Sequence, residues 1–390
     1  MIGGDGEGPT LDGSDGPMAA RMSDSGGSRL SSLALLMGIA LLIGVAAPFV
    51  QFEVERLLFS MDASAAVALR FRLEETAAWW GGRPVYAEHA HAVYPPHAYL
   101  LLRALVVDTS MGVARWAWAT QLAALVGMAC LLFARWGQQE DPMRRLFTAM
   151  VPLLVGATWQ GVGSGQLHYL PMAAGAGAVW LVAGRDRMSL GRDAEAAALM
   201  VLALMKPSSS LPLLILFGVL AGRGRPLALV AGILGLSTLM AAGLQPDSVF
   251  ALISDYLGRA STESTHGALP LGVTLGLLAL FGVWATLRRS SDRLALVAVA
   301  CVVARLAVVH PPHDDVLMLP ALLVLLQAAP KHRAARVLLV LSVLLMALPG
   351  PPVLSEALMD TVRRALSWVY IADGAVVVWL VERRSATPAP

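Results

Sequence analysis

Apolar runs recur along almost the whole chain and are separated by short polar turns. They include residues 33–50, 116–134, 227–244, 268–287 and 334–348. Hydrophobic residues make up 57% of the sequence and charged residues only 14%, well below the charge of an ordinary soluble domain. Several runs are shorter than the roughly 20 residues that an untilted span needs, so tilted or broken helices are expected. The sequence therefore predicts an all-α, polytopic membrane protein.

Basic residues collect between the apolar runs, in clusters from Arg135 to Arg384. Because Lys and Arg favour cytoplasmic loops, placing every cluster inside gives about twelve crossings with both termini cytoplasmic. One integral-membrane domain is expected over residues 33–384. Residues 1–32, rich in Gly, Ser and Asp, are expected to be a disordered cytoplasmic tail, and residues 385–390 a second cytoplasmic tail.

The one long charged interruption, residues 51–96, falls outside the membrane on this topology, as a large extracytoplasmic first loop with juxtamembrane helices. Only one crossing, 116–134, fits between an outer loop and an inner Arg135. The apolar piece 97–107 is therefore expected to be a non-spanning half-helix on the outer side. The polar residues that suit chemistry are then expected to lie on the extracytoplasmic face.

The first loop supplies carboxylates for general-base chemistry. The candidates are Asp62, Glu74 and Glu75, the last two within the helix-like segment 63–80. A base that activates an acceptor hydroxyl must lie near a membrane-borne donor. The alternative is an amphipathic helix on the outer leaflet, with its Trp residues at the headgroups and its acids in water.

Other outer-face residues suit a phosphate or a sugar. Gln166 follows two glycines and offers two donors and an acceptor, unless it only starts a helix. Arg305 lies inside an apolar run, where ionisable residues pair, bind ligand or extend to the headgroups. The complete set of predicted donor-binding residues is Tyr94, Gln166, His168, Lys206, Arg305, His313 and Asp314.

Several other classes of site have no support in the sequence. The His and Asp residues of 310–315 match no standard zinc spacing, so no metal site is predicted, and Asp314 and Asp315 are alternatively caps for the following helix. Phosphate-loop and dinucleotide-binding motifs are missing, and no cofactor is expected. The net charge of +2 is too small to suggest nucleic acid. Cys130 and Cys301 both lie in apolar runs, as core residues do.

A series of short motifs follows a recognisable order. The motifs are Gly81-Gly82 with Tyr86, Tyr94-Pro95-Pro96 before a short apolar helix, Gly165-Gln166 at an outer span end, Gly184-Arg185, Lys206-Pro207, and His313 to Leu317 at the start of a late span. This order resembles glycosyltransferase family 87, integral-membrane enzymes of the GT-C class, over residues 33 to 326.

The resemblance implies an inverting glycosyltransferase of the cell membrane, acting on the outer side of the bilayer. Such an enzyme moves a sugar, commonly mannose, from a polyprenyl-phosphate donor to a hydroxyl of a glycan or lipid acceptor. The lipid-phosphate sugar is a substrate, and no separate cofactor is implied. Arg305 and Lys206 would meet its phosphate.

The chain departs from the family at the catalytic acid. The family usually has an Asp about four turns before the Gly-Gly pair, and counting back from Gly81 reaches the apolar residues 67–68. Asp62 comes too early, and Glu74 and Glu75 come too late. Either Asp62 is the base in a shifted register, or Glu74 or Glu75 substitutes, or transferase activity has been lost. We favour Asp62.

A non-enzymatic carrier or flippase for a lipid-linked substrate is the alternative function, because many transporters have about twelve spans in two related halves. The sequence shows no internal repeat, and its polar residues are expected on one face of the membrane. A transferase is therefore favoured.

Overall fold

The computed structural model describes residues 44, 47–62, 65–105, 110–136, 142–166, 169–183, 189–222, 224–264, 271–289, 291–307, 312–347 and 356–386. The predicted tail at 1–32 and most of the predicted first span lie outside these residues. Apart from Gly44, the described residues belong to one compact unit, Val45–Pro390.

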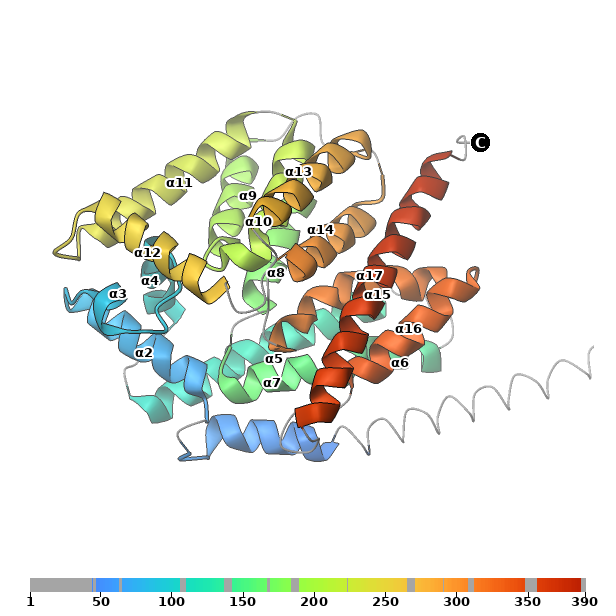
Figure 1. Ribbon diagram of the computed structural model, residues 1–390, viewed down its shortest axis with the longest axis horizontal. Coiled ribbons are helices and arrows are strands. Elements are labelled where there is room, and N and C mark those ends of the chain that lie inside the picture. The colour runs from blue at the N-terminus through green and yellow to red at the C-terminus, as the bar shows by residue number, and fades with distance from the viewer. Residues whose placement is uncertain are drawn as a thin grey trace, which may run out of the picture. The chain divides into compact units, whose positions relative to one another are not determined.

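Every regular element in the described part of the chain is a helix (Figure 1). After a helical stretch at 47–58, the first half contains α2 Val67–Trp80, α3 Val85–Glu88, α4 Pro96–Leu105, α5 Met111–Trp136, α6 Pro142–Leu154, α7 Gly156–Ser164, α8 Tyr169–Val182 and α9 Leu190–Ala203. The second half contains α10 Pro207–Ala221, α11 Gly224–Ala242, α12 Val249–Ser264, α13 Leu271–Leu287, α14 Arg293–Ala307, the 3₁₀-helix η2 Pro312–Met318, α15 Leu319–Ala328, α16 Arg333–Met346 and α17 Glu356–Ala386. The all-α prediction is confirmed for the described residues.

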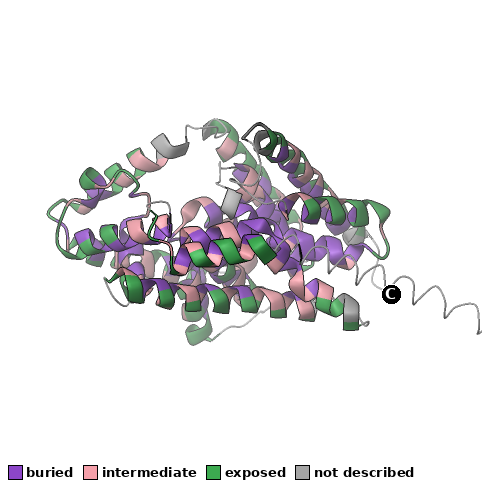
Figure 2. Cartoon of the chain, turned by 90° about the horizontal axis from the view of Figure 1, so that it is seen from below, coloured by how far each residue is buried: buried purple, intermediate pink, exposed green. Residues whose placement is uncertain are grey.

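Three described helices are long and apolar enough to cross a membrane: Met111–Arg135, Gly224–Ala242 and Thr361–Arg383. A bent pair, Arg145–Leu154 with Gly156–Ser164, makes a fourth if it counts as one span. Large apolar side chains are exposed on helices such as α11 and α13, where lipid tails would be suitable neighbours. Figure 2 shows that exposed residues, in green, recur along several helices of the chain. These helices suggest an α-helical membrane protein, and the count of about twelve spans stays a prediction.

The bend between α6 and α7, 46° in angle, has a local cause. Pro152 lies inside α6, and Val155 is extended. The carbonyls freed at this break are bound by side chains, because Thr158 Oγ1 donates to Pro152 O at 2.7 Å and Trp159 Nε1 donates to Leu153 O at 2.6 Å. The short apolar runs predicted such broken helices.

The predicted half-helix at 97–107 corresponds to α4, which contains ten residues. A helix of this length rises about 15 Å, half of the bilayer's hydrocarbon thickness of about 30 Å. The position of α4 in the membrane stays a prediction.

Two clusters of buried side chains hold the helices together. The larger one is built mainly from α8, α9, α10, α14, α15 and α17. The smaller one joins α2, α4 and the first half of α5 to the end of α11. Leu125 and Leu202 pack against both clusters. Leu102, Trp118 and Met205 of the smaller cluster also line the cavity described below.

Candidate functional site

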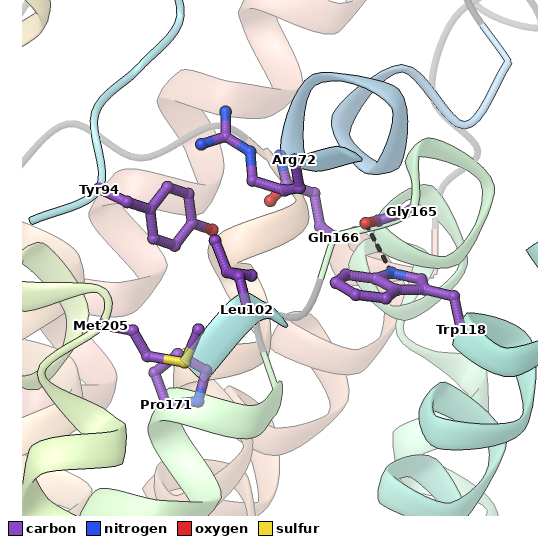
Figure 3. A pocket seen from close by; sticks show the side chains of 8 residues that line it. All are labelled: Arg72, Tyr94, Leu102, Trp118, Gly165, Gln166, Pro171 and Met205. Atoms are coloured by element: carbon purple, nitrogen blue, oxygen red, sulfur yellow. Dashed lines mark hydrogen bonds between the residues drawn. The ribbon is translucent and has the colours of Figure 1, made fainter. Parts of the chain in front are cut away.

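A small cavity beside the end of α7 brings together residues from six segments of the chain (Figure 3). It is lined by Arg72, Tyr94, Leu102, Trp118, Gly165, Gln166, Pro171 and Met205. The space between these residues is about 290 Å³, but this figure includes open solvent, so the enclosed part of the cavity is much smaller. Tyr94 and Gln166 were both predicted as donor-binding residues, and the structure places them in one cavity.

The Gly165–Gln166 turn is fixed in place by its neighbours. Gly165 has a φ of +76°, in the left-handed region that glycine adopts without strain. Its carbonyl accepts a hydrogen bond from Trp118 Nε1 at 2.7 Å, and a Cβ at this position would lie 2.7 Å from the Cβ of Leu69 (Figure 3). Only glycine fits this position, and it holds the Gln166 amide at the cavity.

Arg72 supplies a buried cation at the cavity, and sequence reasoning did not single it out. Its side chain is held on three sides: it donates to Glu75 Oε2 at 2.5 Å and to His91 O at 3.0 Å, and its Cζ lies 4.4 Å from the centre of the Tyr94 ring. The ion pair and the cation–π contact orient the guanidinium group before any ligand binds. The sequence could have predicted the Arg72–Glu75 ion pair, because the two residues are three positions apart on a helix and such side chains are neighbours.

The three predicted acids lie in different environments. Glu75 is 1% exposed, and besides Arg72 it accepts a hydrogen bond from the Tyr99 hydroxyl at 3.3 Å. Glu74, its neighbour on α2, is exposed because successive residues of a helix point in different directions. Asp62 is exposed in the loop before α2, and neither Asp62 nor Glu74 lines the cavity. Glu75 does not line the cavity either, but it is joined to it through its ion pair with Arg72.

Glu53 is a second buried acid from the first loop, outside the predicted set. It is 1% exposed, and its Oε2 lies 3.0 Å from Arg56 Nη1. The same oxygen occupies the space above Gly163, since a Cβ on this glycine would lie 1.8 Å from it. Burial raises the pKa of Glu53 from 4.5 to about 6, although Arg56 acts in the opposite direction. Its position within the apolar pattern of 49–58 was the signal that could have identified it.

The predicted cations Lys206 and Arg305 are both ion-paired in the structure. Lys206 Nζ lies 2.5 Å from Asp314 Oδ1, and Arg305 Nε lies 2.6 Å from Asp315 Oδ1. The two acids are adjacent in η2, so this short helix connects the start of α10 to the end of α14. Met205, which lines the cavity, directly precedes Lys206. Lys206 therefore follows a lining residue without lining the cavity itself. Arg305 pairs with an acid, one of the outcomes expected for it.

Asp314 and Asp315 lie in the first turn of η2, where acids complement a helix dipole. The following helix α15 has Met318 as its N-cap and no side-chain cap hydrogen bond. Both carboxylates also bind cations.

Two predicted residues cannot be placed. His168 lies outside the described residues, and the side chain of His313 is not among the described ones. Among the described residues, no group of three or more His, Cys, Asp or Glu side chains is arranged to hold a metal ion.

No family model matches this sequence, and no curated protein or solved structure is significantly similar to it. The resemblance to glycosyltransferase family 87 therefore stays a prediction. The structure shows an all-α fold in its described residues, with helices long and apolar enough to cross a membrane and a small cavity lined by one buried arginine.

Proposed function

We propose that the chain is an inverting glycosyltransferase that moves a sugar, mannose in the first instance, from a polyprenyl-phosphate donor to an acceptor hydroxyl on the outer face of the membrane. The observation that supports this proposal most is that Arg72, Tyr94 and Gln166 line one cavity. Lys206, which directly follows the lining residue Met205, pairs with Asp314. A guanidinium group suits a phosphate, and an amide suits sugar hydroxyls. The cavity is too small for a polyprenyl chain, which would stay in the lipid.

Arg72 is the residue that we assign to the donor phosphate. It is the cation that lines the cavity, whereas Lys206 and Arg305 are tied to carboxylates in η2. Arginine has five N–H donors, so groups remain for phosphate oxygens after the bonds to Glu75 and His91. In this assignment Glu75 orients the arginine.

Glu53 is the residue that we assign as general base: it does not line the cavity, but its carboxylate fills the space above Gly163, two residues before the lining residue Gly165. A base works best with a pKa near the working pH, and burial brings the pKa of Glu53 to about 6. The acceptor oxygen would attack the anomeric carbon as the bond from that carbon to the phosphate oxygen breaks. The hydroxyl proton passes to Glu53, and the phosphate leaves as an anion beside Arg72. A single displacement of this kind inverts the anomeric configuration.

The test measures sugar transfer in membranes supplied with polyprenyl-phosphate-mannose that is labelled in the sugar. Glu53→Gln should lower the rate by about 10²- to 10⁴-fold, the usual range for loss of a general base. The matched control is Glu55→Gln, an exposed acid on the same helix, which should keep the wild-type rate. Equal transfer rates in the two variants would refute Glu53 as the general base. A wild-type protein that transfers no sugar would refute the proposed transferase function.

The carrier or flippase function is favoured by one observation, the bent pair α6 and α7 next to the cavity, because carriers often build their sites from broken helices. A cysteine placed at the exposed Glu55 separates the two functions. A transferase leaves it open to a membrane-impermeant thiol reagent from one side only, whereas alternating access exposes it to both sides in turn.

A further inference from the structure

Asp373 is a buried acid within α17, in the stretch Thr361–Arg383 that is long and apolar enough to cross a membrane. Its side chain is 0% exposed. The next residue, Gly374, lets α14 approach closely, since a Cβ there would lie 2.9 Å from Val302 Cγ1. A carboxyl group in such a position carries a large energetic cost when it is charged, and acids inside spans usually have a function.

The surroundings of Asp373 offer it one hydrogen bond. Ser342 Oγ, on α16, donates to Asp373 Oδ2 at 2.8 Å. Oδ1 is buried and has no hydrogen-bond partner among the described residues. A single neutral donor does not balance a buried negative charge, whereas the neutral acid needs no counter-charge.

Tyr370 lies one turn before Asp373 on α17 and is buried. Its ring centre is 5.5 Å from Arg305 Cζ, and its hydroxyl has no hydrogen-bond partner among the described residues. Of the other helices packed on α17, α15 has no charged residue, and α16 carries its arginines near its start. Tyr370 is therefore one helical turn from Asp373 and next to Arg305, which pairs with Asp315.

We propose that Asp373 is a proton-binding site within the helix bundle, and that its proton exchanges with water through Tyr370 and the Arg305–Asp315 pair. The carboxylate takes its proton from water and becomes a neutral acid, with the proton on Oδ1 and Ser342 bonded to the carbonyl oxygen Oδ2. This site is separate from the transfer chemistry proposed above, and it does not depend on that chemistry.

Infrared spectroscopy of the purified full-length chain in lipid nanodiscs tests the proton site. The carbonyl stretch of a protonated carboxyl group should be present near neutral pH and should be lost in Asp373→Asn, which keeps the shape of the neutral acid. Ser342→Ala should move the band to higher frequency, because the carbonyl loses its donor. The matched control is Asp193→Asn, which removes a buried acid that is paired with Arg225 and should remove no such band.

The proposed path is tested by transfer of the same sample into heavy water. Exchange of the carboxyl proton shifts the band, and Tyr370→Phe should slow this shift several-fold. A band that persists in Asp373→Asn, or no such band in the wild type, would overturn the proton site. An exchange rate that is unchanged in Tyr370→Phe would overturn the path.

Discussion

Gly165 is a position where one added methyl group should disturb the site strongly. Gly165→Ala places a side chain on a backbone with a φ of +76°, which costs an L-residue roughly 1–2 kcal/mol. The new Cβ would also lie 2.7 Å from Leu69 Cβ and 3.1 Å from Leu69 N. Overpacking of this kind typically costs about 1–3 kcal/mol, and here part of the overlap is with backbone, which yields less than a side chain. The expected loss of stability is therefore about 2–5 kcal/mol.

The assay is thermal unfolding of the purified protein in detergent, followed by tryptophan fluorescence. Trp118 donates its indole N–H to Gly165 O, so a displaced turn should also change the emission before unfolding begins. The midpoint should fall by several degrees relative to the wild type.

The matched control is Gly235→Ala on α11, where no atom lies within 4 Å of the added Cβ. Alanine is favoured over glycine inside a helix by about 1 kcal/mol, so this variant should unfold at or above the wild-type temperature. If Gly165→Ala and Gly235→Ala had the same unfolding midpoint, the close packing inferred around Gly165 would be refuted.

Three further predictions follow from the charged residues. Because the pKa of Glu53 is raised in the folded state, folding stability should fall by at most about 2 kcal/mol as the pH rises from about 4.5 to about 6, and Glu53→Gln should flatten this slope while Glu55→Gln keeps it. Sugar transfer should decline as the pH falls through about 6, since a protonated Glu53 cannot act as a base; a rate that stays constant down to pH 5 would contradict this role. Lys206→Met should cost about 3–5 kcal/mol, because Asp314 loses its lysine partner, and adding Asp314→Asn should recover part of this; additive losses in a double-mutant cycle would contradict the pairing.

Local patterns in the sequence were sufficient to predict the class of fold and several helices. The helix-like segment 63–80 corresponds to α2, Val67–Trp80, and the apolar piece 97–107 corresponds to α4, Pro96–Leu105. Glycine and proline mark these boundaries, and their effect on the backbone is local. The sequence also predicted the turn before Gln166, because glycine favours the left-handed conformation that Gly165 adopts.

The partners of the charged residues were not predictable in the same way. Lys206 and Asp314 are 108 residues apart, and Glu53 meets Gly163 only after α7 has folded back. The choice between Glu74 and Glu75 depends on which side of α2 is buried, and the apolar residues of this helix are spread around its axis without a dominant face. Tertiary packing therefore decides which acids reach the site, and a single sequence does not encode it in any local pattern.

The central claim, that this chain transfers a sugar from a lipid-phosphate donor with inversion, is tested most directly by the stereochemistry of the product. The purified full-length protein in nanodiscs would be given polyprenyl-phosphate-mannose and an extract of membrane lipids and glycans as acceptor. We predict release of polyprenyl phosphate and a mannosylated product whose anomeric configuration is opposite to that of the donor. A product with the donor's configuration, or no transfer of mannose at all, would contradict the account.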